Sequence, residues 1–150
     1  MALLNRYRRK GGFEQLLKLI ETSNPAKRDQ LLNLIEQEDQ GWAELLKMKA
    51  LSIEKIFSWQ DVYLKDIVHN LNPRVLGIAL KGKPEAVQAK VEAVVPKIKW
   101  DEISDYTKQN FSAGEIFAAE TQIVQSTREM NENGYIRFED VDPRLALKAA

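Results

Sequence analysis

The sequence has no cysteine among its 150 residues and only one histidine, His69. The lack of cysteine excludes disulfide bonds, thiolate nucleophiles and cysteine-ligated metals. A metal site needs several donors, so we expect a surface or interface role for His69 rather than metal ligation or general-base catalysis. We expect neither a metal nor a cofactor.

The sequence also lacks an excess of one charge and a long apolar run. Its 22 Lys and Arg residues balance 22 Asp and Glu residues, so net charge does not draw the chain to nucleic acid or anionic lipid. No apolar run approaches the length of a membrane span, and the first residues lack the apolar core of a signal peptide. We therefore expect a cytoplasmic protein without a membrane span or a nucleic-acid partner.

Hydrophobic residues make up 44% of the chain, enough for a real core in one domain, or in one domain with a small satellite. We expect the rest of the chain to pack around residues 61–96, because this stretch holds three helical patterns and a proline marks the start of each new helix. Asn72 before Pro73 predicts an N-cap followed by proline at the first helical position. The next segment, 75–80, is apolar on nearly every side and predicts a short buried central helix.

Residues 1–10 predict a short helix that ends in a cluster of basic side chains. The cluster comprises Arg6, Arg8, Arg9 and Lys10. Positive charge is favourable at a helix C-terminus, and we prefer this interpretation to a phosphate-binding or nucleic-acid-binding arm. Gly11 and Gly12 can end the helix and are also a natural hinge, because neither restricts φ.

Apolar stripes between residues 11 and 50 predict three helices of about ten residues each. Such a triplet is small, so we expect it to stack on a neighbouring repeat or on a second copy of the chain. Residues 51–58 form an apolar connector whose short pattern does not decide between helix and extended chain.

Beyond this connector, residues 97–110 predict a helix with Ile103 turned inward. A capping box at Ser112 and Glu115 opens the longest helix, which we expect to end near Gly134. Residues 135–138 predict a packed extended segment, followed by a weakly ordered tail. No βαβ pattern occurs, so the predicted fold class is all-α.

Three acidic residues, Asp101, Glu102 and Asp105, are the best catalytic candidates in the sequence. Helical spacing places Asp101 and Asp105 on one outer face without an evident pocket, whereas catalytic carboxylates need a cleft that separates their pKa values. We therefore prefer a solvated charged face and assign no catalytic residue. The protein is not expected to be an enzyme.

Three short motifs occur in a characteristic order: Gly11-Gly12, Ala79-Leu80-Lys81-Gly82 and Glu132-x-Gly134. In this order and spacing, residues 11–138 resemble the C-terminal region of the flagellar motor switch family FliG. The resemblance implies a right-handed α-superhelix, in which an armadillo-like helix triplet precedes a compact multi-helix C-terminal subdomain. The implied parts are a short helix or linker at 1–10, the triplet at 11–50, an apolar hinge at 51–58, the FliG C-terminal-like subdomain at 59–138 and a tail at 139–150.

The resemblance also implies a place in the cytoplasmic rotor of the bacterial flagellum, reaching the inner membrane only through a motor or envelope complex. The implied partners are a stator cytoplasmic segment, contacted by a charged face, and a FliM-like switch protein. The charged face comprises Lys81, Lys97, Lys99, Asp101, Glu102 and Asp105. The implied hinge residues are Gly11, Gly12, Ala50, Leu51, Ser52 and Ile53.

The sequence departs from the family pattern in three ways. The family's Met-Phe-x-Phe hinge motif falls on residues 50–53, which keep apolar character without an aromatic ring. A basic family position falls on Ile98, and only Asp105 remains of a pair of acids. The family's N-terminal domain and nearly all of its middle domain have no counterpart. Two hypotheses result: a rotor module with a partly retained charge pattern, or a diverged adaptor in a non-flagellar complex.

Overall fold

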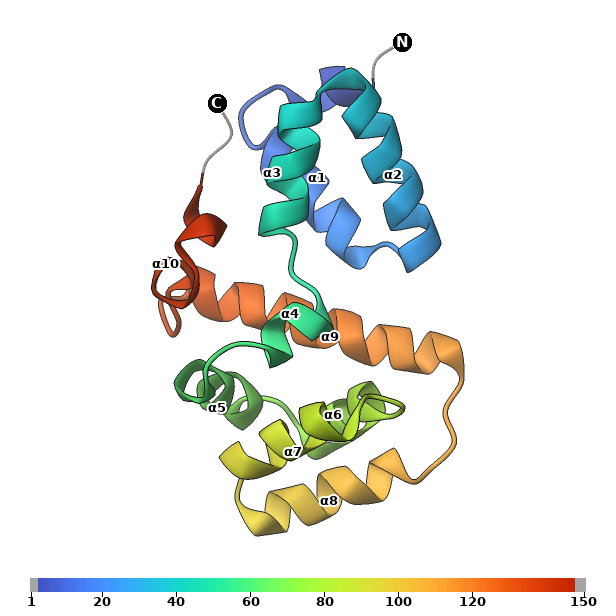
Figure 1. The fold of residues 1–150 in the computed structure, drawn as a ribbon, viewed down its shortest axis with the longest axis vertical. Coiled ribbons are helices and arrows are strands. Elements are labelled where there is room, and N and C mark those ends of the chain that lie inside the picture. The colour runs from blue at the N-terminus through green and yellow to red at the C-terminus, as the bar shows by residue number, and fades with distance from the viewer. Residues whose placement is uncertain (1–2, 148–150) are drawn as a thin grey trace. The chain divides into compact units, whose positions relative to one another are not determined.

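A computed structural model describes residues 3–147, and all regular structure in this range is helical (Figure 1). The predicted all-α class is confirmed. The described chain forms two compact units, one from the residues up to Leu51 together with those from Phe138 onward, the other Ser52–Arg137. The elements of the first unit are η1 (Leu3–Tyr7), α1 (Gly12–Thr22), α2 (Pro25–Glu38), α3 (Gln40–Lys49), α10 (Phe138–Val141) and η2 (Pro143–Ala146). Those of the second are α4 (Ile53–Phe57), α5 (Asp61–His69), α6 (Pro73–Leu80), α7 (Glu85–Val94), α8 (Lys97–Thr107) and α9 (Ala113–Glu132).

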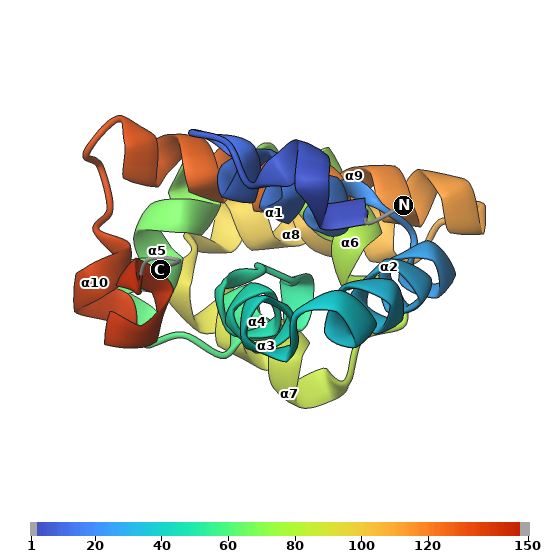
Figure 2. The same cartoon turned by 90° about the horizontal axis from the view of Figure 1, so that it is seen from above.

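The three helices predicted between residues 11 and 50 are α1, α2 and α3, and their apolar stripes form the core of the first unit. Fully buried members of this core include Leu16, Ile20, Ile35 and Leu46. Helices α2 and α3 lie side by side (Figure 2). Asp39 separates them: its backbone N–H caps the end of α2, and its carboxylate accepts a hydrogen bond from the N–H of Trp42 in α3.

The N-terminal segment is a short 3-10 turn rather than a longer helix, and it belongs to the same core. Leu4 is buried, and the carboxylate of Glu38 accepts hydrogen bonds from the N–H groups of both Leu3 and Leu4. A Cβ on Gly12 would lie 2.0 Å from the carbonyl oxygen of Tyr7, so only glycine permits this approach. Gly11 has a φ of 77° and caps α1.

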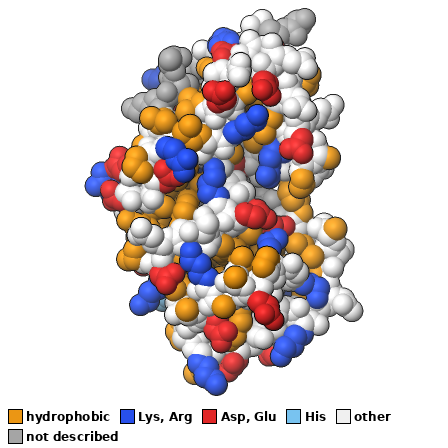
Figure 3. Space-filling view, in the orientation of Figure 1, with side chains coloured by type: hydrophobic (Ala, Val, Ile, Leu, Met, Phe, Trp, Pro, Cys, Tyr) orange, Lys and Arg blue, Asp and Glu red, His pale blue; other side chains and the backbone are white. Residues whose placement is uncertain are grey.

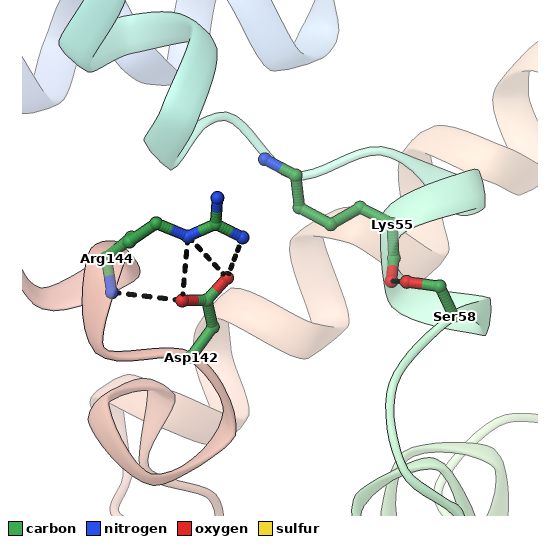
Figure 4. A network of polar contacts seen from close by, with 4 residues as sticks. All are labelled: Lys55, Ser58, Asp142 and Arg144. Carbon is green, nitrogen blue, oxygen red and sulfur yellow. Dashed lines mark hydrogen bonds and ion pairs between the residues drawn. The ribbon is translucent and has the colours of Figure 1, made fainter.

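The tail differs from the prediction of weak order. Ile136 is buried next to exposed Tyr135, as the packed extended segment requires, but Phe138 already begins α10. Asp142 then accepts a hydrogen bond from the N–H of Arg144 and pairs with its guanidinium group at 2.8 Å (Figure 4). This cap starts η2, whose Leu145 is buried. The prediction of weak order is wrong over the described part, and residues 148–150 lie outside it.

The second unit is built on α6, the predicted central helix. It lies between α8 and α9 and contacts both (Figure 1). All residues from Val75 to Leu80 are buried. A Cβ on Gly77 would lie 2.4 Å from the Cβ of Tyr106 and 2.6 Å from the carbonyl oxygen of Ile103, so glycine lets α6 and α8 approach backbone to backbone.

Side-chain caps start two of the other helices of this unit, α4 and α9. The predicted capping box forms at the start of α9, between Ser112 and Glu115. The undecided connector is helical, because Ser52 caps α4 by accepting a hydrogen bond from the N–H of Lys55. Helix α4 contacts α7 and α9, and α5 contacts α7.

Candidate functional site

The charged face predicted on α8 is largely exposed. Ile103 is fully buried, and Tyr106 is half-buried against Gly77 of α6. This packing fixes the rotation of the helix. The charged side chains that it leaves exposed are Lys97, Asp101, Glu102 and Asp105. Asp101 and Asp105 are four residues apart and thus share one side of α8, where they can meet a partner's positive charge.

Lys99 lies on α8 as well but turns toward α5. Its Nζ donates hydrogen bonds to the carbonyl oxygens of Val68, at 2.7 Å, and His69, at 3.3 Å. These carbonyls end α5, where a positive charge is favourable. Partial burial lowers the pKa of Lys99, opposed by the nearby charge of Glu102. Lys99 therefore joins two helices of the second unit.

Lys81 has a similar position at the other end of α8. Its Nζ donates a hydrogen bond to the carbonyl oxygen of Thr107, the last residue of α8, at 3.2 Å. The side chain is half-buried. Lys81 thus reaches α8 from the end of α6, Lys99 reaches from α8 to α5, and each has an acceptor within the chain. Their contact with a partner stays a prediction.

The second unit also exposes two large apolar side chains to which the sequence pattern assigns no binding role. Ile98 is 78% exposed on α8, and Val62 is 62% exposed on α5. Val62 lines an open groove of about 470 Å³ together with residues of α5 and the end of α7. The exposure of Val62 could have been predicted from the sequence, because Val62 falls outside the apolar stripe of its helix.

The hinge residues predicted at 50–53 span the junction of the two units. Leu51 is buried, and its N–H donates a hydrogen bond to Oε2 of Glu21 at 2.6 Å. Ala50 caps the end of α3, Ser52 caps the start of α4, and Ile53 is buried. Glu21 itself is 4% exposed, a buried acid that the sequence did not single out. Hinge motion at these residues, and at Gly11 and Gly12, stays a prediction.

The described surface carries charges of both signs and no cluster that could hold a metal. Among residues 3–147, no three His, Asp or Glu side chains come close enough to hold a metal ion. Lys and Arg side chains are interspersed with Asp and Glu on the face drawn in Figure 3. Within the described range, no helix is long and apolar enough to cross a membrane.

The described fold is that of an all-helical protein of short packed helices, one of which, α8, exposes charges of both signs. The sequence model of the FliG C-terminal domain matches residues 33–138. The chain therefore belongs to the FliG C-terminal domain family. Among curated proteins, no relative matches the chain.

A solved structure supports this assignment. The chain is similar to full-length FliG from Aquifex aeolicus, at 26% sequence identity and a TM-score of 0.52. The match covers 82% of this chain and 39% of the Aquifex chain. The resemblance seen in the sequence is thus confirmed, while the chain spans well under half the length of that FliG.

Proposed function

We propose that this protein is a non-enzymatic interaction module of the bacterial flagellar rotor and switch complex. The observation that carries the proposal is the family match over residues 33–138, which includes the whole of α8. The exposure of Asp101 and Asp105 supports a docking role, because complementary charge steers encounter and selects partners. The protein would be located in the cytoplasm and would be held at the inner membrane only through the motor complex.

The partners of this module would be a stator cytoplasmic segment and a FliM-like switch protein. The exposed charges of α8 are suited to the first of these. Torque generation would be only partly retained, since a family basic position is occupied here by Ile98, and Lys81 and Lys99 already bind carbonyl groups within the chain. A contact made by the reduced set of exposed charges on α8 would therefore be weaker than one made by the family's full alternating pattern.

A diverged adaptor in a non-flagellar cytoplasmic or envelope-associated complex is the second candidate. The exposed Ile98 favours it, because an apolar side chain in place of a charge changes which surface fits the helix. The two candidates share the scaffold and differ in the partner.

Co-purification from the native host, combined with swimming assays of a deletion strain, separates the candidates. The rotor proposal expects recovery of a flagellar switch protein and impaired swimming. Recovery of non-flagellar proteins alone, with normal swimming, would favour the adaptor and refute the rotor module.

Self-association through the helix triplet of the first unit is part of the same proposal. Leu34 on α2 is 44% exposed and offers an apolar contact to a second copy. Light scattering should show a dimer at high concentration that Leu34→Glu weakens, with Asp29→Glu on the same helix as control. A strict monomer at all concentrations would count against stacking between copies.

A further inference from the structure

The basic cluster near the N-terminus has no part in the proposed rotor contacts, and the structure folds it around a cavity. An open hollow of about 480 Å³ lies within the first unit. It is lined by Tyr7, Arg8, Arg9, Lys10, Gly11, Phe13, Glu14, Trp42, Lys49 and Ala146. This volume is in the range of pockets that hold small molecules.

The loop that precedes Gly12 forms one side of this hollow. Because the carbonyl of Tyr7 lies against the first residue of α1, the chain from Arg8 to Gly11 forms a tight loop. The N–H of Gly12 donates to the carbonyl oxygen of Arg9 at 2.9 Å and closes the loop. Three successive basic residues, Arg8, Arg9 and Lys10, therefore line one cavity, whereas on a helix their side chains would point in different directions.

Charge in the lining is strongly positive although the whole chain is neutral. Four cationic side chains face one carboxylate, that of Glu14. Arg8 pairs with Asp39 at 3.1 Å, which holds its guanidinium group in place. Across residues 3–147, Arg9 and Lys10 make no side-chain ion pair, and both are exposed. Two cations therefore remain available to an anion.

Aromatic side chains form the other part of the wall. Phe13 and Trp42 pack edge to face with ring centroids 5.1 Å apart, and the guanidinium of Arg8 lies 5.1 Å from the Trp42 ring. Lys49 lies over Phe13 at 5.7 Å. Tyr7 lines the cavity and is only half-buried. Aromatic rings and planar guanidinium groups bind bases by stacking.

We propose that this cavity binds a small phosphate-bearing ligand with a planar ring, of the nucleoside monophosphate class. Arg9 and Lys10 would contact the phosphate through charge-assisted hydrogen bonds, and the Tyr7 side of the cavity would contact the ring. The size of the hollow fits one nucleotide. The site lies in the first unit, whereas the proposed stator-facing helix α8 lies in the second, so each can fail without the other.

Calorimetric titration of the full chain with AMP, at low ionic strength, tests the proposal. We expect saturable binding with one site per chain. Arg9→Gln combined with Lys10→Gln should weaken it by about tenfold or more, because charge-assisted hydrogen bonds are lost. Arg6→Gln is the matched control: Arg6 belongs to the same exposed cluster but does not line the cavity, and its removal should leave affinity within about twofold.

Two further arms separate the ligand classes. Inorganic phosphate should bind several-fold more weakly than AMP. The Tyr7→Leu variant should have a lower affinity for AMP and an unchanged affinity for phosphate. Circular dichroism checks that each variant folds. The proposal is overturned if AMP does not saturate, if Arg6→Gln has the effect of the double variant, if phosphate alone binds as well as AMP, or if a tetraglutamate peptide competes equally well.

Discussion

Two glycines stand where any side chain would overlap backbone atoms, and both shape the surfaces proposed to bind. Gly12 sets the loop of basic residues in the first unit, and Gly77 sets the distance between α6 and α8 in the second. Since α8 takes its rotation from this contact, the exposure of Asp101 and Asp105 depends on Gly77. The close packing at Gly77 thus determines which charged side chains of α8 face solvent.

Replacing Gly77 by alanine should destabilise the protein by about 1–3 kcal/mol, the usual cost of overpacking a closed contact. The added Cβ would meet the carbonyl of Ile103 and the Cβ of Tyr106, neither of which is a flexible chain end. Urea unfolding measures the change. Gly114→Ala is the control, because its nearest neighbour, Oγ of Ser112, would lie 3.9 Å away. Equal stability of the two variants would contradict the close contact.

Asp39 should make the first unit sensitive to acid. Hydrogen bonding from the N–H of Trp42, followed by the Arg8 guanidinium, lowers the pKa of Asp39 below its ordinary value of 3.8. Because the folded-state pKa is depressed, its contribution to stability is complete above that value and is lost as pH falls through the folded pKa. Thermal midpoints of Asp39→Asn should therefore fall less between about pH 5 and 2 than those of the parent chain.

Asp29→Asn, an exposed position on α2, is the matched control for the acid series. It should reproduce the parent's pH profile. If Asp39→Asn also keeps that profile unchanged, the ionised carboxylate of Asp39, with its Trp42 hydrogen bond and its Arg8 ion pair, contributes no stability above its pKa, and the account of this cap is wrong.

Most helices of the described chain are short, and several of them begin at a side-chain cap. The sequence predicts α6 and α9 well, because each begins with a side-chain cap that the structure reproduces, at Asn72 and Ser112. Asp142 before Pro143 carries the same signal, and it starts η2 in the tail expected to be weakly ordered. That segment was missed because periodicity needs more residues than a single turn provides.

The candidate site could be predicted only in part, since a helical pattern shows which residues share a face but not where a long side chain ends. Asp101 and Asp105 are exposed, as the spacing predicted. Lys81 and Lys99 have the same side chain and charge as Lys97, yet each donates a hydrogen bond to a carbonyl group on another helix. Such tertiary acceptors leave no local sequence signal.

Lys99→Gln should destabilise the second unit by about 1 kcal/mol, since it removes a charged donor from the end of α5. Lys97→Gln should change the unfolding free energy by less than about 0.5 kcal/mol, because Lys97 is exposed. Denaturant unfolding compares the two. Equal effects would show that the contact of Lys99 with Val68 and His69 contributes nothing.

At the scale of the whole chain, two units with separate cores carry two separate proposals. The second unit, with α8, would bear the proposed rotor contact. The first unit bears the basic cavity and the apolar surface of the helix triplet. Residues 50–53 join them, with Glu21 fixing the N–H of Leu51 on one side.

The most direct test of the rotor module is the affinity of the full chain for purified stator cytoplasmic segment and FliM-like switch protein. We predict saturable binding to at least one of them, with the stator contact weakened by about tenfold or more in the double variant Asp101→Lys with Asp105→Lys. Asp29→Lys with Glu92→Lys, two exposed acids outside α8, changes net charge equally and should preserve binding. Absence of binding to both partners, or an equal loss in the control, would contradict the account.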